Sequence, residues 1–489
     1  ARELGLSEDH EGIIELPTDA PAGAPAAQVL GLDDPLIDIS ITPNRPDCLG
    51  VHGIARDLAA AGLGSLNSGA VEPVPGDGPC PIDIGLRFDA DAIDACPMFA
   101  GRLVRGVRNG PSPDWLRSQI EAVGLRSISA LVDITNYISL DRGRPLHVYD
   151  ADKLRGQIHA RLGRAGEKFL ALDGNEYEPG LEACVIADEN GVLALGGVIG
   201  GAATGCTEAT VNVFIESAYF DPLRTAATGR KFGVESDARY RFERGVDPQF
   251  VVPGLELATK MVMQLCGGAP SDVRVAGATP PATAPIEFRP ERVAKLTGMD
   301  LADADCVRIL DSLGFAVEAD TRPMAVRAPS WRPDIHLEPD LIEEIARIHG
   351  FDKLPATPLP RVAALSGKAV SVAQNRVRWA KRLLAERGMM EAVSWSFMDQ
   401  RRAELFGGGA PELVLANPIS SELSVMRPSL LPNLLAAAAR NVDRGFADLA
   451  LFEVGPQYAG DRAGDQTTAA TGIRCGQTHP RHWSKLARA

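Results

Sequence analysis

The sequence lacks the patterns that mark several large classes of protein. Its eight cysteines are scattered along 489 residues, and no two of them form a CxxC pair. We therefore expect reduced thiols, and neither a disulfide framework nor a zinc site. No apolar run approaches the roughly 18–20 residues that cross a bilayer, and the opening stretch ARELGLSEDHEGIIELP has no signal-peptide core. These absences predict a cytoplasmic protein without a membrane partner.

Internal repeats and low-complexity tracts are also missing, and aromatic residues make up only 5% of the chain. The rest of the composition is that of a globular protein, and the chain is too long for one hydrophobic core. Its formal net charge of −14 opposes attraction to phosphates over the molecule as a whole. This charge argues against nonspecific coating of nucleic acid, but it does not exclude a basic face on one domain.

Three stretches rich in Gly, Pro or Ser indicate linkers, at 64–82, 275–285 and 354–367. The segment before the first linker should end in a helix through VHGIARDLAAAG that Gly62 terminates. The segment after the third should begin with the basic amphipathic helix NRVRWAKRLLAERG. We expect strands in EAVSWSF, ELVLANP and ADLALFEVG to follow, with a helix from Pro428 to Asn441.

Between the first two linkers the pattern predicts a mixed α+β domain. A helix opened by Ser112-Pro113 carries Leu116, Ile120 and Val123 on one face. Strands are expected in ARLGRAGEKFLALDGNEYE, EACVIAD, GVLALGG and VNVFIES, before a closing helix. The next segment, 286–353, should contain helices, the strands FAVEA and MAVRA, and a last helix from Glu338 to His349.

Four polar, glycine-rich strings hold the candidate site residues: RSISALVDITNYISLDRGRPLHVYD (126–150), GGVIGGAATG (196–205), ESAYFD (216–221) and GVESDARYRFERGVDP (233–248). We expect them to place their polar side chains on loops between short apolar strands. Those side chains are Arg126, Asn136, His147, Glu216 and the turn Ser236-Asp237-Ala238. A site for a hydroxyl-bearing small molecule on a nucleic acid needs such a polar pocket, with glycine backbone and basic charge nearby.

Each candidate also has a structural reading. A lone histidine after a GRP turn, such as His147, is commonly a hydrogen-bonding structural residue. Glu216 follows the apolar strand VNVFIE and could be solvated at a sheet edge or project into a pocket. The glycine run lacks the strand–GxGxxG–helix context of a dinucleotide site. It predicts a tight turn, backbone N–H groups that line a pocket, or both.

Two charged clusters have alternative readings as well. Basic residues of the 224–244 stretch alternate with acidic ones, so about half should form surface ion pairs, and the others could contact phosphates. In RPDIHLEPDLIEEIARIHG, carboxylates recur at i, i+3 and i+4 on one helical face. Such oxygens suit Mg²⁺, although acidic residues in a first turn also complement the helix dipole.

The same four strings resemble the editing domain of the bacterial phenylalanyl-tRNA synthetase beta subunit, and the resemblance extends over essentially the whole chain. It implies an α+β, multidomain fold: the end of an OB-fold tRNA-binding module, a small α+β domain, an editing domain, a small helix/strand domain with an acidic metal-binding helix, and a partial, degenerate class II synthetase core with an antiparallel sheet. The corresponding ranges are 1–28, 29–70, 83–274, 280–355 and 368–489. By this comparison most of the N-terminal module is missing and the chain stops inside the last domain.

The resemblance also implies an activity and a set of site residues. Tyrosine wrongly attached to tRNA-Phe would be hydrolysed in a pocket with His147 and Glu216 as catalytic residues, Glu216 facing the tyrosine hydroxyl. The substrate-binding residues would be Arg126, Thr135, Asn136, Gly197, Gly200, Ser236 and Ala238. No Ser-His-Asp order or activated cysteine is evident, so hydrolysis would depend on a positioned water.

Cofactors and partners follow from the same resemblance. Mg²⁺ would be held by Asp334, Asp340, Glu343 and Glu344, and ATP would be bound on a partner alpha subunit that charges tRNA-Phe with phenylalanine. The assembly would be an alpha2beta2 heterotetramer. Two alternatives are a freestanding aminoacyl-tRNA editing hydrolase and a noncatalytic tRNA-binding scaffold.

Overall fold

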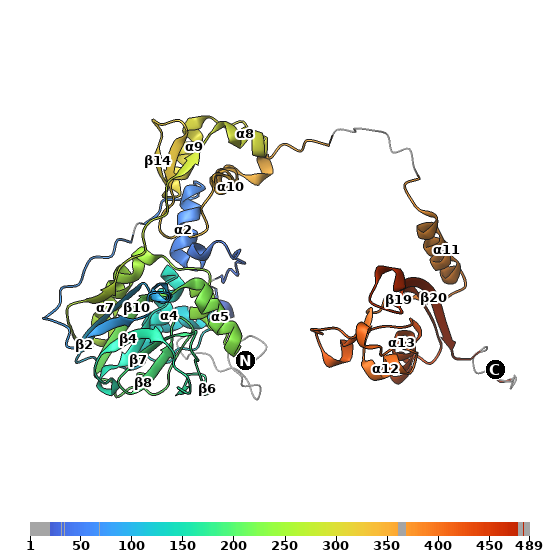
Figure 1. Cartoon of the computed structure of the whole chain (residues 1–489), viewed down its shortest axis with the longest axis horizontal. Coiled ribbons are helices and arrows are strands. Elements are labelled where there is room, and N and C mark those ends of the chain that lie inside the picture. The colour runs from blue at the N-terminus through green and yellow to red at the C-terminus, as the bar shows by residue number, and fades with distance from the viewer. Residues whose placement is uncertain are drawn as a thin grey trace. The chain divides into compact units, whose positions relative to one another are not determined.

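The structure is a computed structural model, and it describes residues 20–30, 32–33, 35–67, 69–359, 368–477 and 483. The chain divides into two compact units, Ala1–Thr357 and Pro358–Ala489 (Figure 1). Each unit combines helices with sheets, which confirms the predicted mixed α+β, multidomain fold. Most of the predicted OB-fold end at 1–28, and 360–367 of the third linker, lie outside the described residues.

Two five-stranded sheets form the centre of the first unit. One sheet has β2 and β10 at its centre and comprises β2 (Met98–Arg105), β3 (His147–Asp150), β10 (Asn212–Tyr219), β11 (Ala269–Pro270) and β12 (Arg274–Gly277). The other comprises β1 (Ile84–Arg87), β4 (Ile158–Leu162), β7 (Cys184–Asp188), β8 (Gly191–Leu195) and β9 (Ile199–Gly200). Helices α4 (Ala130–Arg142) and α7 (Val251–Cys266) pack on the first sheet (Figure 1), and α3 (Asp114–Ala122) packs on α4.

The first sheet is therefore covered on both faces, and the side chains of β10 alternate between them. Val213 and Ile215 join the core beneath the helices, whereas Phe214 and Ala218 join the core shared with the second sheet. Glu216 has the same parity as Phe214 and Ala218, so its carboxylate lies on the side of the second sheet. It sits inside the strand, where the sequence had predicted the strand to end.

Helix α4 corrects the prediction that the 126–150 stretch contains only loops and short strands. Its run of β-branched residues favours a strand by local propensity. In the structure Leu131, Ile134 and Ile138 recur with helical spacing and are fully buried against α3 and α7. Packing of that face overrides the local propensity, and Gly143, in the left-handed conformation, ends the helix.

Shorter elements complete this region: α1 (Ala26–Val29), α2 (Val51–Ala60), β5 (Phe169–Leu170), β6 (Glu176–Tyr177), α5 (Pro222–Phe232) and α6 (Asp237–Phe242). The predicted turn at Ser236 is the beginning of α6. The helix opened by Ser112-Pro113 forms as α3, but Val123 lies beyond its last residue and is exposed, unlike Leu116 and Ile120.

Residues 286–353 form a small three-stranded sheet with three helices. The elements are β13 (Ile286–Phe288), α8 (Glu291–Thr297), α9 (Asp303–Ser312), β14 (Ala316–Glu318), β15 (Met324–Arg327) and α10 (Glu338–His349). The predicted inward face of α10 is confirmed, since Leu341 and Ile345 are fully buried. Ala60 at the end of α2 belongs to the same core, which ties the N-terminal segment to this sheet.

The second unit contains a three-stranded sheet in which β16 pairs with β19 in parallel and β19 pairs with β20 antiparallel. Its described elements are α11 (Val372–Glu386), β16 (Met390–Glu391), β17 (Phe397–Met398), α12 (Gln400–Glu404), β18 (Val425–Met426), α13 (Leu431–Asp443), β19 (Leu449–Tyr458) and β20 (Gln466–Cys475). The strand predicted in ELVLANP is wrong: a short 3₁₀ helix, Pro411–Leu413, occupies its start.

Candidate functional site

A cavity of about 70 Å³ lies between the two sheets of the first unit. Ligand sites as a whole usually enclose about 300–1,000 Å³, so this one suits a single side chain better than a nucleoside. Its walls come from β3, β8, β9, β10 and α6. The lining includes His147, Tyr149, Leu195, Gly196, Gly197, Val198, Gly200, Glu216, Ala218, Phe220, Ala238 and Phe242.

Glu216 is the acidic group of this cavity and is 6% exposed. The Tyr149 hydroxyl donates a hydrogen bond of 2.6 Å to its Oε2. Burial raises the pKa of Glu216 to about 7, although the bond from Tyr149 lowers it. The carboxyl group is thus a buried acceptor that already binds one phenol.

His147 lies beside Glu216, because the two residues are directly paired between β3 and β10. Burial lowers the pKa of His147 to about 4, so the imidazole is neutral at pH 7. Its Nε2 is buried and has no hydrogen-bond partner in the described part of the chain. The ring packs edge-on against Tyr149, with ring centroids 4.5 Å apart. A neutral imidazole with a free nitrogen can accept a proton from a water.

Glycines allow the β8–β9 turn to approach these side chains. A Cβ at Gly200 would lie 2.9 Å from His147 Nε2, too close for any real Cβ atom. Gly197 has a φ of +71°, which disfavours any other residue. Both glycines line the cavity, and the substrate-binding role that the resemblance implies for them stays a prediction.

The beginning of α6 closes another wall. Ala238 lines the cavity. Ser236 caps the helix by accepting from the Arg239 N–H at 3.1 Å, and its hydroxyl donates to the Val198 carbonyl at 2.5 Å. Ser236 therefore fixes the wall instead of lining the cavity.

The other three predicted substrate-binding residues do not line this cavity. Arg126 is exposed in the loop between α3 and α4. Thr135 is buried inside α4 and donates to the Val132 carbonyl at 2.7 Å. Asn136 is half-buried on the same helix and makes no side-chain hydrogen bond to any residue that the structure describes.

Sequence reasoning missed Tyr149, Phe220 and Phe242. Tyr149 stands two residues after His147, so the alternation of a strand would have placed both on one face. Phe220 and Phe242 meet edge-on with centroids 5.2 Å apart and form the apolar end of the cavity. No local sequence signal connects these two rings, since they come from different elements.

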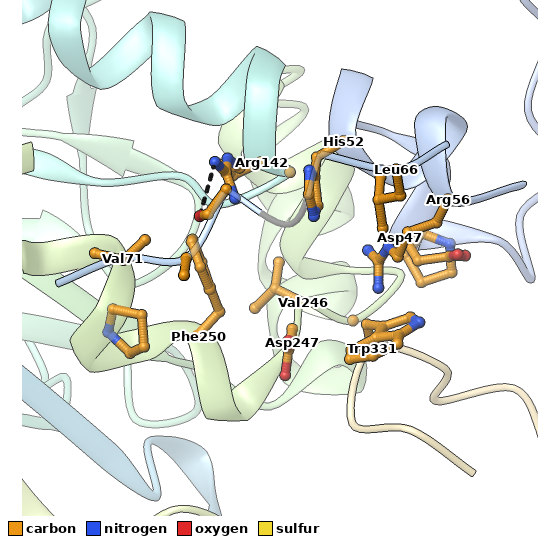
Figure 2. Close-up of a pocket in the computed structure, with 16 residues that line it drawn as sticks. Asp47, His52, Arg56, Leu66, Val71, Arg142, Val246, Asp247, Phe250 and Trp331 are labelled. Carbon is orange, nitrogen blue, oxygen red and sulfur yellow. Dashed lines mark hydrogen bonds between the residues drawn. The ribbon is translucent and has the colours of Figure 1, made fainter. Parts of the chain in front are cut away.

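A second cavity, of about 420 Å³, lies elsewhere in the first unit (Figure 2). Its walls are formed by residues from the N-terminal segment, from the region of α4 and α7, and from the 286–353 region. Figure 2 shows His52, Arg56, Arg142, Asp247, Phe250 and Trp331 around it. The sequence had singled out none of these residues.

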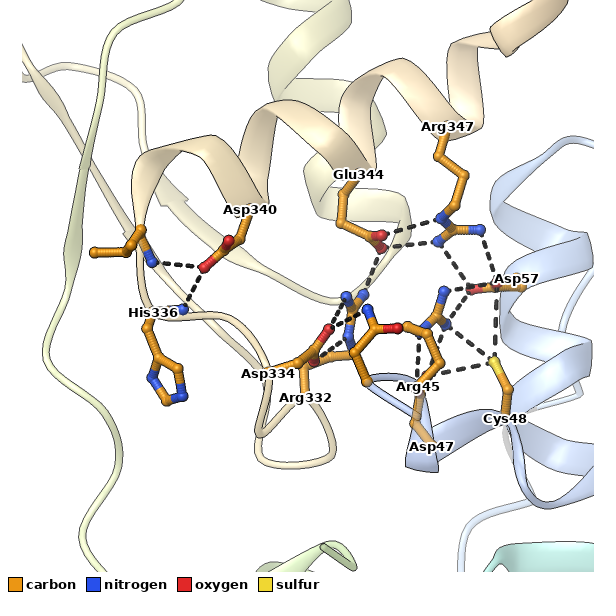
Figure 3. Close-up of polar contacts among 12 residues, drawn as sticks. Arg45, Asp47, Cys48, Asp57, Arg332, Asp334, His336, Asp340, Glu344 and Arg347 are labelled. Carbon is orange, nitrogen blue, oxygen red and sulfur yellow. Dashed lines mark hydrogen bonds and ion pairs between the residues drawn. The ribbon is translucent and has the colours of Figure 1, made fainter. Parts of the chain in front are cut away.

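Asp334 before α10 and Glu344 within it lie in a network of alternating charges (Figure 3). Arg332 binds Asp334 through two hydrogen bonds of 2.8 Å and also pairs with Glu344. Arg347 donates to Glu344 at 2.8 Å and to Asp57 of α2 at 2.8 Å. Burial alone would raise the pKa of Glu344, but the two arginines outweigh it and hold the pKa at about 2.

The remaining two predicted metal ligands carry no such partner. Asp340 accepts the backbone N–H groups of His336 and Leu337 at 2.9 and 2.8 Å, which caps α10. Glu343 is exposed and forms no ion pair within the described ranges. The four carboxylates are hard oxygen donors of the kind that Mg²⁺ prefers. Arg332 now bridges Asp334 and Glu344 in the way that a cation would.

Among the described residues, only Asp47, Cys48 and Asp57 come close enough together to suggest a metal site. Arg45 donates to both carboxylates, at 2.9 Å each, and burial raises the pKa of Cys48 to about 12. A protonated thiol and a guanidinium group do not fit a metal ion. This cluster is an ion-pair network that joins the N-terminal segment to α10.

Three domain families match successive parts of this chain. Residues 95–267 match the B3/4 domain, 286–351 the tRNA synthetase B5 domain, and 355–489 the phenylalanyl tRNA synthetase beta chain CLM domain. Two of these three descriptions name tRNA synthetases. The Glu216 cavity lies within the first match and the acidic helix α10 within the second. No helix in the described part of the chain combines the length and the apolar character needed to cross a membrane.

Similar chains are phenylalanine–tRNA ligase beta subunits from Paramagnetospirillum magneticum, Rhodopseudomonas palustris and Rhodospirillum rubrum. They are 54%, 53% and 55% identical to all of this chain, which spans 61% of the length of each. The chain belongs to the phenylalanine–tRNA ligase beta subunit family. It is also similar to an N-terminal fragment of the phenylalanyl-tRNA synthetase beta subunit from Pyrococcus horikoshii, at 20% identity and a TM-score of 0.33, over 64% of this chain and 86% of that one.

Proposed function

We propose that this chain acts as the beta subunit of a phenylalanine–tRNA ligase and hydrolyses Tyr-tRNA-Phe. In an assembly with alpha subunits it would support the charging of tRNA-Phe, while ATP and phenylalanine are bound by the partner. The identity to beta subunits over the whole chain supports this role.

The phenol–carboxyl contact between Tyr149 and Glu216 carries the editing part of the proposal. A tyrosine attached to tRNA presents the same group, and the second oxygen of Glu216 makes no hydrogen bond to a described residue. Phenylalanine would leave this buried acceptor unpaired, which costs roughly 1–3 kcal/mol or more. Sites built around a hydroxyl can discriminate by about 10⁴–10⁵, so the correct product would be spared.

His147 would act on the water that attacks the ester. We infer that its neutral imidazole orients or deprotonates the attacking water through Nε2, the buried nitrogen without a partner. The ester carbonyl would then have to lie near the open end of the cavity, with the nucleotide outside it. The small volume of the cavity agrees with a pocket that takes in only the tyrosyl side chain.

Arg230 and Lys231 near the end of α5 are the basic residues best suited to contact tRNA. Both are exposed and form no ion pair with a described residue, whereas Arg239, Arg241 and Arg244 pair with acidic neighbours. We also propose that Mg²⁺ binds at Asp334, Asp340, Glu343 and Glu344, which would have to come closer together than they lie in this structure. Because Arg332 and Arg347 neutralise two of these, Asp340 and Glu343 would provide the free charge.

The test uses the alpha–beta assembly with Glu216→Gln, which keeps the shape of the side chain. Hydrolysis of Tyr-tRNA-Phe should fall by at least about tenfold, the cost of one good hydrogen bond, while charging with phenylalanine continues. Unchanged clearance of Tyr-tRNA-Phe would remove Glu216 from the site. Loss of both activities would point to a structural role instead.

A further inference from the structure

The cavity of about 420 Å³ in Figure 2 has the size of a small-molecule site and shares no lining residue with the Glu216 cavity. Much of its wall is apolar. Leu66 and Val71 come from the N-terminal segment. Val246 and Phe250 come from the segment just before α7, and Trp331 comes from the loop before α10. An apolar wall with a few polar groups is the usual composition of a site for an organic ligand.

Arg56 is the unusual residue of this wall. Its guanidinium group lies over the Trp331 ring at 4.2 Å, and its Nε is buried without a hydrogen-bond partner. The residue forms no ion pair with any residue that the structure describes. Burial lowers the pKa of Arg56, although the nearby carboxylates of Asp47 and Asp247 act in the opposite direction. The protein therefore loses stability by desolvating this cation without a direct anionic partner.

Other charged groups of the cavity are already compensated. Arg142 donates from Nε to Asp141 at 2.8 Å, and Asp47 is paired with Arg45 at 2.9 Å. Asp247 accepts the Gln249 N–H at 2.9 Å through Oδ1. Among the cations of the wall, Arg56 is thus the one that lacks a carboxylate partner.

The Trp331 ring covers one side of the Arg56 guanidinium group and so limits the direction from which a ligand can approach it. The N–H groups that point away from the ring can match the two oxygens of a carboxylate or phosphate. His52 stands between Arg56 and Arg142 in Figure 2. Burial and the two arginines lower its pKa, so at pH 7 it is a neutral group that can donate one further hydrogen bond.

We propose that this cavity binds a small organic anion with an aromatic body. The anionic group lies on the edge of Arg56, and the ring packs among Val246, Phe250 and Trp331. The carboxyl group of Asp247 also lines the cavity and repels an anion from its own part of the wall, which favours one orientation of the ligand. This site is independent of the editing pocket and of the metal ligands.

The experiment measures binding of 3-phenylpropionate and phenyl phosphate to the purified chain, without an alpha subunit, by calorimetry or ligand-observed NMR. The neutral probe 3-phenylpropan-1-ol has a similar body and no charge. Both anions should bind at least about tenfold more tightly than the alcohol, because a charged hydrogen-bond pair contributes that much. The Arg56→Gln variant should lose this preference.

Three further variants complete the test. Arg56→Lys keeps the positive charge and should retain part of the preference, which guards against simple unfolding of Arg56→Gln. Arg105→Gln changes an exposed arginine of β2 outside the cavity, and Glu216→Gln alters the other cavity, so neither should change binding. Equal binding of the alcohol and the anions, anion binding that survives Arg56→Gln, or anion binding that Glu216→Gln removes would each overturn the proposal.

Discussion

Glu216 in β10 lies directly opposite His147 in β3, and burial moves the pKa values of the two side chains in opposite directions. Glu216 rises from 4.5 to about 7, and His147 falls from 6.5 to about 4. Between about pH 4 and about pH 7 the folded protein therefore holds both groups uncharged. In the unfolded chain both would be charged over much of that window.

These opposite pKa shifts predict that the folding stability of two variants changes with pH in opposite directions. The native state retains the Glu216 proton that the unfolded chain loses above pH 4.5, so its contribution to stability falls as pH rises from 4.5 to about 7. The folded protein holds His147 without the proton that the unfolded chain binds below pH 6.5. The contribution of His147 to stability therefore rises from about pH 4 to 6.5. In wild type the two contributions largely cancel.

Urea unfolding of the chain across this window provides the measurement. With His147→Gln, stability should fall with rising pH by roughly 1–3 kcal/mol, and with Glu216→Gln it should rise by a similar amount. Parallel slopes in both variants would show that the two groups do not titrate as a buried pair.

A second prediction concerns Tyr149→Phe. The Tyr149 hydroxyl lowers the pKa of Glu216, so its removal should raise that pKa further. If ionised Glu216 accepts the tyrosine hydroxyl, hydrolysis of Tyr-tRNA-Phe should rise with pH through this pKa. The pH–rate profile of the alpha–beta assembly should then shift to higher pH in the variant. A profile that stays in place would separate Tyr149 from the function of Glu216.

The sequence was sufficient for much of the fold but for less of the site. Strands β7 and β8 follow from short apolar runs between turn residues, and the inward face of α10 follows from its helical periodicity. The 130–142 helix was missed although Leu131, Ile134 and Ile138 recur with helical spacing, because its β-branched residues favour a strand by local propensity. Packing against the preceding helix α3 and against α7, which is distant in sequence, decides for the helix.

The site residues also divide into those that the sequence indicated and those that it missed. Gly197 and Gly200 could be inferred from the need for a close turn, and both line the cavity. Strand alternation could have placed Tyr149 on the same face as His147, but its hydrogen bond to Glu216 depends on the pairing of β3 with β10, which no local pattern reveals. Arg332 was missed as a partner of Glu344 for a similar reason: it stands twelve positions earlier in the chain, and its ion pair forms only when that loop folds back on α10. The other partner, Arg347, lies at i+3 on the same helix, a spacing that the sequence shows directly.

A third prediction addresses tRNA binding. Replacing Arg230 and Lys231 together with glutamine removes two exposed cations that form no ion pair with a described residue. Affinity for tRNA should fall, and the slope of log K against log salt should decrease by about 1–2, since each phosphate contact releases close to one counterion. The matched control is Arg239→Gln with Arg244→Gln, whose charges are already paired with Glu243. An equal loss in both pairs would mean that only net charge matters.

The last prediction tests Mg²⁺ at α10. The Asp340→Asn, Glu343→Gln double variant removes the two carboxylates without arginine partners, so the ion pairs of Glu344 stay intact. Mg²⁺ at ten times its dissociation constant should stabilise the wild-type alpha–beta assembly by about 1.4 kcal/mol, because it binds only the folded state. The double variant should lose this gain, whereas a Glu291→Gln, Asp300→Asn control of equal charge should keep it. Thermal melts at fixed ionic strength provide the measurement.

Glu344→Gln would be a poor substitute, since it leaves Arg332 buried and costs about 3–5 kcal/mol with or without the metal. An equal response to Mg²⁺ in wild type and double variant would show that these carboxylates are only a solvated face of the helix.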